Sequence, residues 1–153
     1  MSATSAYKIS SFKPTTRTRR SPQWSNIKFL EDVNPWISNC ISRIDELASL
    51  PQDWDSYGSN PTSGDARRAV LRFLANAPEG LVPEPSVSPV PGGGIGFHWR
   101  VEDRDLELEF LPDGKIEYLK IASTGALKDQ PEEGILEPLT DKKLWYWLSG
   151  VRE

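Results

Sequence analysis

Apolar side chains recur at intervals of three and four residues in two parts of the chain, and this spacing predicts two amphipathic helices. The first covers residues 34–50, where Asn34 is placed to cap the helix. The second covers residues 63–77, where Thr62 or Ser63 can accept the capping hydrogen bond. The apolar positions are Ile37, Cys40, Ile41, Ile44, Leu47 and Ala48 in the first helix and Ala66, Ala69, Val70, Phe73 and Leu74 in the second.

Apolar and polar residues alternate after residue 94, which is typical of strands that have one face covered. A tight turn at Glu102-Asp103 pairs Val101 with Arg104, so we expect two antiparallel strands around it. Continuing this ladder gives the pairs Trp99–Leu106, Phe97–Leu108, Ile95–Phe110, Arg100–Asp105 and His98–Glu107. Ser86–Val90 is a candidate edge strand before this hairpin.

The residues Pro112-Asp113-Gly114 predict the next hairpin turn. We expect Leu111 to pair with Ile116 across this turn. The predicted pairs further along are Leu108–Leu119, Leu106–Ile121 and Glu107–Lys120. One face of the sheet then carries the row His98, Glu107 and Lys120, and the other face presents Phe97, Trp99, Leu106, Leu108, Leu119 and Ile121 to the helices.

A final short helix is predicted over residues 142–150. Leu144, Trp147, Leu148 and Val151 share one of its faces, and Trp145 and Tyr146 flank that face. Two roles follow for so aromatic a helix. It can close the open side of the domain, or it can present Trp145 and Tyr146 as an exposed patch that binds a partner.

Helices that cover one face of an antiparallel sheet make a two-layer α+β domain. We therefore predict an antiparallel meander of three to four strands covered by two or three helices, in a single domain over residues 24–153. Residues 122–139 contain Gly and Pro breaks and are predicted to form a long loop. Residues 1–23 are rich in Ser, Thr and Arg and are predicted to form a flexible arm.

Charge is distributed unevenly along the chain. The formal net charge is -4, but residues 1–24 hold Lys8, Lys13, Arg17, Arg19 and Arg20 and no acid, which makes +5. The rest of the chain therefore carries -4 - 5 = -9. An acidic body can cover a basic surface of another protein, and the sequence thus favours a protein partner of that kind.

The basic arm gives an alternative function, which is contact with nucleic acid. Cationic side chains bind phosphates with an affinity that depends strongly on salt. The candidate contacts are Arg17, Arg19 and Arg20 of the arm, together with Arg67, Arg68 and Arg72 of the second predicted helix. The three helical arginines are equally well explained as a solvated helix face.

Several classes of chemistry are not favoured by the sequence. Cys40 is the only cysteine, so an internal disulfide is impossible. Cys40 and the only histidine, His98, are too few ligands for a usual zinc site. The run Gly92-Gly93-Gly94 lacks the Lys-Ser/Thr and the helix that follow a phosphate-binding loop. We expect no metal, no cofactor, no membrane span and no secretory signal, and a cytoplasmic protein.

Two groups of residues are candidate catalytic sites. In the row formed by His98, Glu107 and Lys120, Glu107 could orient the imidazole for acid–base work, but no nucleophile accompanies them. Asp113, Glu117 and Lys120 resemble the Pro-Asp…Asp/Glu-x-Lys pattern of metal-dependent nucleases. Two residues separate acid from lysine here, where that pattern has one. We therefore assign no catalytic residue, and a small enzyme with an unrecognised site is only the third interpretation of the sequence.

The loop between the first two helices is the most unusual segment of the chain. Residues 50–61 combine Trp54, Asp55, Tyr57 and Gly58 with acids and prolines. It can be a structural clasp, with Trp54 in the core, Tyr57 packed on the sheet and Asp55 fixing the turn. It can instead be a binding surface, because Trp and Tyr are favoured anchors in interfaces. Its place between two helices that cover a sheet favours the clasp.

This loop resembles one in a family of small, largely uncharacterised bacterial proteins. The residues that carry the resemblance are Leu50, Trp54, Asp55, Tyr57, Gly58 and Pro61, then Trp99, and then Leu108, Glu109, Phe110, Asp113 and Gly114. The match covers about residues 44–121. The resemblance implies an accessory protein of bacteria or their mobile elements that binds a partner, such as an antitoxin, an immunity protein or a component of phage defence.

Overall fold

The structure, a computed structural model, describes residues 34–77, 82–125, 128, 130–137 and 141–150. The predicted arm of residues 1–23 lies outside them. The elements are helices α2 (Trp36–Ala48) and α3 (Gly64–Leu74), strands β1 (Ser86–Val90), β2 (Gly94–Val101), β3 (Arg104–Phe110), β4 (Ile116–Ala122) and β5 (Glu132–Ile135), and helix α4 (Asp141–Ser149). In this part of the chain, no helix is long and apolar enough to cross a membrane.

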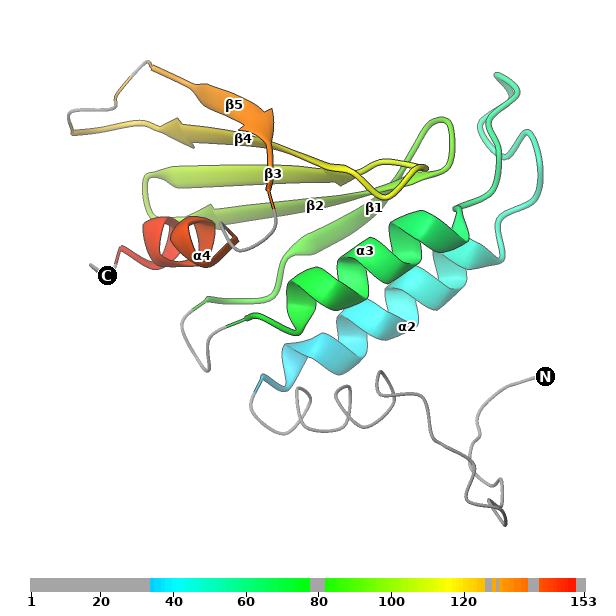
Figure 1. Cartoon of the computed structure of the whole chain (residues 1–153), viewed down its shortest axis with the longest axis horizontal. Coiled ribbons are helices and arrows are strands. Elements are labelled where there is room, and N and C mark those ends of the chain that lie inside the picture. The colour runs from blue at the N-terminus through cyan, green and yellow to red at the C-terminus, as the bar shows by residue number, and fades with distance from the viewer. Residues whose placement is uncertain (1–33, 78–81, 126–127, 129, 138–140, 151–153) are drawn as a thin grey trace, which may run out of the picture.

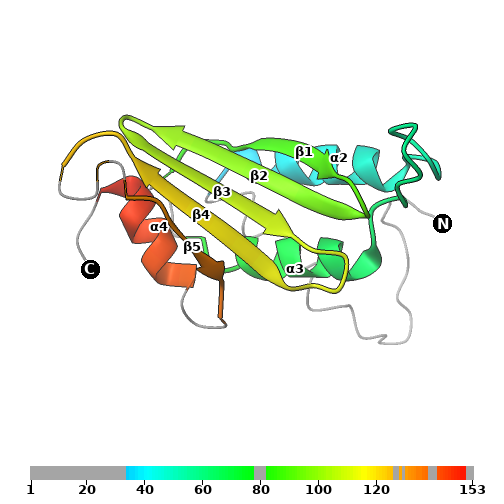
Figure 2. The same ribbon diagram turned by 90° about the horizontal axis from the view of Figure 1, so that it is seen from above.

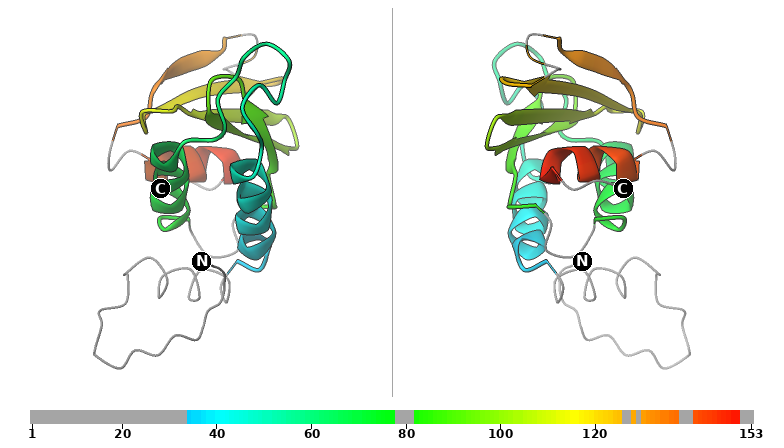
Figure 3. Two further views of the ribbon diagram at one scale, coloured as in Figure 1. Left: turned by 90° about the vertical axis from the view of Figure 1, so that its right-hand side faces the viewer. Right: turned by 90° about the vertical axis from the view of Figure 1, so that its left-hand side faces the viewer.

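The fold is α+β, with an antiparallel sheet on one side and helices on the other. The five strands lie in the order β1-β2-β3-β4-β5, so each strand pairs with its neighbour in the sequence. Helices α2 and α3 run side by side under the sheet, and α4 covers the same face at the other end (Figure 1). The two end views in Figure 3 place all three helices on one face. The opposite face, seen in Figure 2, carries no helix in the described part of the chain.

The two long helices follow the predicted apolar stripes. Ile37, Ile44 and Leu47 of α2 are buried, as are five residues of α3. Ser63 is the N-cap of α3 and its hydroxyl accepts a hydrogen bond from Ala66 N, as predicted for this position. The cap of α2 differs from the prediction: Pro35 is its N-cap residue, and Asn34 is buried before it.

The register of the first predicted hairpin is confirmed. Strands β2 and β3 pair Val101 with Arg104, and the ladder continues in step to Ile95 and Phe110. Glu102 takes a positive φ of 56°, which suits the tight two-residue turn. Apolar and polar side chains alternate along both strands, so a slip of the register by one residue would turn the apolar side chains of one strand away from the helices.

The register predicted for β3 and β4 is wrong by one residue. Phe110 pairs with Ile116, Leu108 with Tyr118 and Leu106 with Lys120. The cause is the turn, in which Leu111 N donates to Lys115 O at 2.8 Å and Gly114 has a φ of +92°. This is a three-residue loop closed by a glycine in the left-handed region, where the prediction needed four residues. As a result Leu119 and Ile121 lie on the face without helices.

The long loop predicted for residues 122–139 contains a fifth strand. Strand β5 pairs Glu133 with Leu119 and Ile135 with Glu117. Its sequence, Glu-Glu-Gly-Ile, lacks the apolar alternation from which a strand is predicted. Both edges of the sheet are therefore short strands: β1, which contains Pro89, and β5.

Aromatic side chains fill the space between the sheet and the helices. Phe97, Trp99 and Phe110 come from the sheet, Phe73 from α3 and Trp145 from α4, and all are buried. Phe73 stacks on Trp145 with 4.7 Å between ring centroids and packs edge-on against Phe110 at 5.8 Å. These rings compensate for a low apolar content, because each one buries a large area.

Candidate functional site

The loop between α2 and α3 is held in shape by the carboxylate of Asp55. Oδ1 of Asp55 accepts hydrogen bonds from Tyr57 N at 2.9 Å and Ser59 N at 3.2 Å. Oδ2 accepts from the hydroxyl of Ser59 at 2.5 Å. A side chain that bonds the backbone two and four residues further on fixes a turn without help from the rest of the fold.

Further hydrogen bonds close the same loop around its tip. Asp53 accepts from Gly58 N at 2.6 Å through its carboxylate, and its own N donates to Ser59 O at 2.7 Å. The amide of Gln52 donates to Gly58 O and Ser59 O, and the indole of Trp54 donates to Asn60 O at 3.1 Å. The loop is thus a self-contained unit.

The backbone of this loop is strained at its tip. Asp53 and Ser56 have a φ of 65°, and Gly58 has a φ of 87°. Positive φ is uncommon for residues other than glycine, and strain of this kind concentrates at functional sites. Ser56 and Gly58, both with positive φ, flank Tyr57.

Tyr57 projects into solvent, with 91% of its surface exposed. Figure 1 shows the loop extending beyond the ends of α2 and α3, past the hairpin ends of the sheet and not over its face. Trp54 is half-buried and does not belong to the aromatic core. The clasp interpretation is therefore wrong for both aromatics, because the loop closes on itself instead of packing on the sheet. It is right for Asp55, which fixes the turn.

Ser63, just after the loop, connects the helix layer to the sheet through two hydrogen bonds. Its N donates to Gly93 O at 2.9 Å and its hydroxyl donates to Pro112 O at 2.8 Å. Ser63 therefore bonds the tips of two hairpins while it also caps α3. The sequence indicated the cap but gave no signal for these two long-range bonds.

We predict that the order of the loop depends on pH through Asp55. The hydrogen bond from the Ser59 hydroxyl, followed by that from Tyr57 N, lowers the pKa of Asp55 below its ordinary value of 3.8. The ionised form therefore stabilises the loop above that value, and this contribution is lost as the pH falls through the lower folded pKa. NMR amide shifts of Tyr57 and Ser59 should change below about pH 3.8. Asp55→Asn should abolish this titration, and a variant that kept it would contradict the assignment.

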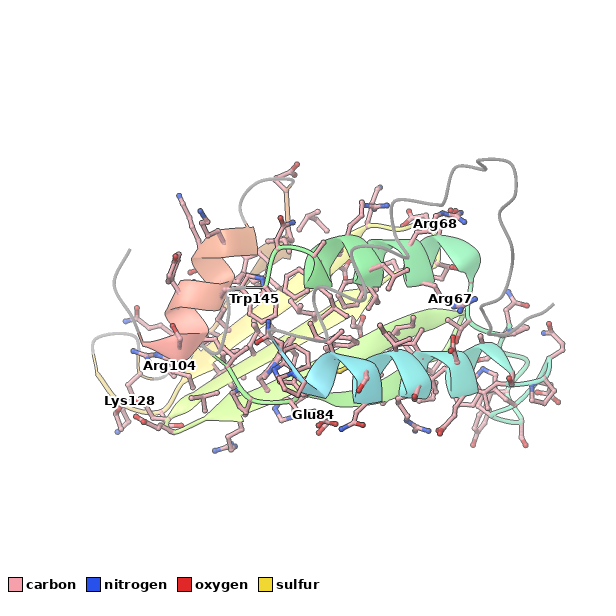
Figure 4. All side chains as sticks on the ribbon, turned by 90° about the horizontal axis from the view of Figure 1, so that it is seen from below. Arg67, Arg68, Glu84, Arg104, Lys128 and Trp145 are labelled. Atoms are coloured by element: carbon pink, nitrogen blue, oxygen red, sulfur yellow. The ribbon has the colours of Figure 1, made fainter. Side chains whose placement is uncertain are left out.

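The C-terminal helix contributes to the core instead of forming an exposed patch. Trp145 is fully buried together with Leu144 and Leu148. Figure 4 shows Trp145 between α4 and the other helices. The prediction of Trp145 as a partner-binding residue is therefore wrong, and Tyr146 beside it is half-buried. Trp147 is also half-buried, and the cations of Arg104 and Lys120 lie over its ring.

The predicted row of His98, Glu107 and Lys120 does not exist. The ring of His98 bonds Asp105 at 2.9 Å, although Glu107 is its partner in the register. Lys120 lies on the helix-covered face, because the β3–β4 register is shifted by one residue. There its ammonium pairs with Glu132 at 3.2 Å.

Tyr118, Lys120 and Glu132 form a small polar cluster at the β4–β5 edge. Tyr118 donates a hydrogen bond to Glu132 at 2.9 Å, and this bond raises the pKa of the phenol. The same bond, and then the one from Lys120, lowers the pKa of Glu132. The ion pair with Glu132 explains how a lysine can lie on the covered face, where its ammonium also lies over the ring of Trp147.

Two of the three helical arginines are paired with acids. Arg67 contacts Asp45 of α2 at 2.9 Å, and Arg68 pairs with Asp65 one turn earlier. Figure 4 places Arg67 between α2 and α3. These pairs reduce the positive charge that α3 offers to a phosphate. The arm residues Arg17, Arg19 and Arg20 lie outside the described residues, so nucleic-acid contact stays a prediction.

Cys40 is expected to be chemically inert in the folded protein. Its burial, and secondarily the charge of Glu84, raise the pKa of the thiol to about 12. Only the thiolate is a good nucleophile, so a thiol reagent such as Ellman's reagent should not react with the native protein near pH 8. Reaction should become complete in denaturant. Rapid labelling of the native protein would show that Cys40 is accessible.

The sheet face without helices is acidic where strands β3, β4 and β5 lie side by side. Glu107, Glu109, Glu117 and Glu133 line a shallow cavity there. No group of three or more histidine, cysteine or acidic side chains in the described part of the chain has the geometry to hold a metal ion.

Comparison of the chain with protein-family models, with curated proteins and with solved structures found no match. The family resemblance carried by residues 50–61 and by the later hairpin therefore stays a prediction. The candidate site rests on its own geometry.

Proposed function

We propose that this chain is a non-enzymatic protein-binding module and that the loop tip around Tyr57 contacts the partner. One observation carries the proposal: a tyrosine that is 91% exposed sits at the tip of a strained loop that closes on its own hydrogen bonds. The core gains little from a side chain in that position. Tyrosine does offer an interface a large rigid surface with a polar end.

The internal bonds of the loop support binding for an energetic reason. A flexible loop loses conformational entropy when it is ordered at an interface, and that loss weakens binding. Asp55 and Asp53 already hold the loop backbone in one shape before any partner arrives. The fitting partner is a protein with an apolar pocket and a hydrogen-bond acceptor at its end. An antitoxin, immunity or phage-defence role is the biological setting we propose.

Replacing Tyr57 by alanine should weaken partner binding by about 2 kcal/mol or more, or about 30-fold, because buried interface tyrosines often contribute that much. The whole chain would be used to capture partners from a lysate of its source, followed by titration of the purified partner. Tyr57→Phe removes the hydroxyl and keeps the ring, so its affinity shows how much each contributes to binding. The stability of Tyr57→Ala should stay within about 0.5 kcal/mol of the wild type, since the side chain is exposed.

Ile135→Ala is the matched control for this experiment. Ile135 is the other large apolar side chain that is exposed in the described residues, at 46%, and it lies on the sheet. We expect Ile135→Ala to bind the partner with the affinity of the wild type. Equal retention by Tyr57→Ala and the wild type would refute a binding role for the loop.

A further inference from the structure

The open sheet face is hollowed near strand β5. The cavity has a volume of about 340 Å³ and is lined by side chains from β3, β4 and β5. Two of them are apolar, Leu119 and Ile135, and four are glutamates: Glu107, Glu109, Glu117 and Glu133. This face is separate from the Tyr57 loop.

The charges of this face are not balanced. Glu109 and Glu117 are directly opposite each other on β3 and β4, an arrangement that disfavours the sheet. None of the four glutamates forms an ion pair with any residue that the structure describes. The other end of the same face differs, because Asp105 there forms an ion pair with Arg100 and a hydrogen bond with the ring of His98.

The apolar side chains lie among these acids. Leu119 is opposite Glu107 on one neighbouring strand and Glu133 on the other. Ile135 is opposite Glu117 and is nearly half-exposed. An occupant that matches this face therefore needs cations at its margins and an apolar side chain between them. A simple cation would leave Leu119 and Ile135 in water.

We propose that this face binds the basic N-terminal arm, residues 1–23, of the same molecule. The arm carries five cationic side chains and no acid. Two of them, Lys8 and Lys13, flank Ile9 and Phe12, so the arm combines positive charge with apolar side chains. That is the chemistry that the open face lacks, and contact would relieve the repulsion between Glu109 and Glu117.

The length of the intervening chain allows this contact. About 20 residues separate Lys13 from the start of α2, and an extended chain of that length reaches about 70 Å. A domain of about 120 residues has a radius of gyration of only about 14 Å. The arm can therefore pass from the helix layer to the far side of the sheet.

Carbodiimide cross-linking of the whole chain tests the proposal directly. The reagent joins a lysine amine to a carboxylate that touches it, with loss of water, and mass spectrometry locates the new amide. We expect cross-links from Lys8 or Lys13 to one of the four glutamates in the monomer. They should be lost when salt is raised from about 0.01 M to about 1 M, since the Debye length falls from about 30 Å to about 3 Å.

Two variants with equal changes in charge provide the control. Glu109→Gln with Glu117→Gln should remove cross-links to this face, including those to Glu107 and Glu133. Asp45→Asn with Glu46→Gln, on α2, should leave them intact. The proposal is overturned if the arm cross-links to carboxylates all over the surface, or if the first variant has no effect. Mixing isotope-labelled and unlabelled chains decides whether a second copy is the occupant instead, which would also overturn it.

Discussion

Replacing Trp145 by alanine is expected to lower the free energy of unfolding by about 3–5 kcal/mol, the usual cost of deleting a buried aromatic side chain. Trp145 is fully buried, stacks on Phe73 and meets Trp99 edge-on with 5.4 Å between centroids. The variant would leave a cavity where three elements meet, namely α3, α4 and the sheet. Small domains have a total stability of only about 5–15 kcal/mol, so the variant should be close to unfolding at room temperature.

Urea unfolding at equilibrium measures this effect, and two variants serve as controls. Trp145→Phe keeps a ring against Phe73 and loses no hydrogen bond, because the indole N–H has no acceptor in the described structure. It should therefore cost far less than alanine. Tyr146→Ala changes the half-buried neighbour, and we expect a loss of about 1 kcal/mol. A Trp145→Ala variant as stable as Tyr146→Ala would show that α4 does not close the core.

Replacing Gly93 by alanine is expected to cost about 2–3 kcal/mol, from backbone strain and overpacking together. Gly93 has a φ of +104°, which side chains rarely adopt. A Cβ there would also lie 3.0 Å from Pro61 O. The added carbon would press on the segment in which Ser63 N bonds Gly93 O, so the link between the helix layer and the sheet should weaken.

Gly92→Ala separates the two causes. Gly92 is in the same turn with a similar φ of +96°, but a Cβ there would meet nothing within 4 Å. Thermal or urea unfolding should therefore show a smaller loss for Gly92→Ala, and the difference between the variants measures the contact with Pro61. Equal losses would mean that strain alone acts, and that the contact relaxes at no cost.

The elements with a strict periodicity were predictable from the sequence. Helices α2 and α3 have one apolar stripe each, and β2 and β3 have one apolar face each around a two-residue turn. In all four, only one orientation buries the apolar side chains. The register between β2 and β3 was predictable because only this pairing places the apolar residues of both strands on the same face of the sheet.

Where apolar residues occur on both faces, the sequence could not decide. Strand β4 offers Ile116 and Tyr118 on one face and Leu119 and Ile121 on the other, so either register buries two large side chains. The three-residue turn between β3 and β4 determines which register forms. Helix α4 has the same ambiguity, because Trp145 and Trp147 are both large and apolar.

The candidate site was predictable in its residues but not in its exposure. Trp54, Asp55 and Tyr57 stood out from the sequence, and the role of Asp55 in the turn is confirmed by its three hydrogen bonds. Residue type does not tell whether an aromatic in a loop faces inward. That depends on where the loop lies relative to the sheet, which is a property of the whole fold.

The two short edge strands have a consequence for the solution behaviour of the protein. Unpaired strand edges recruit strands from other molecules and so seed fibrils. Strand β1 has Pro89, which has no N–H to offer to an incoming strand, and β5 offers only four residues, two of them glutamates. Both edges of the sheet therefore resist the addition of strands from other molecules, so we expect little edge-to-edge aggregation.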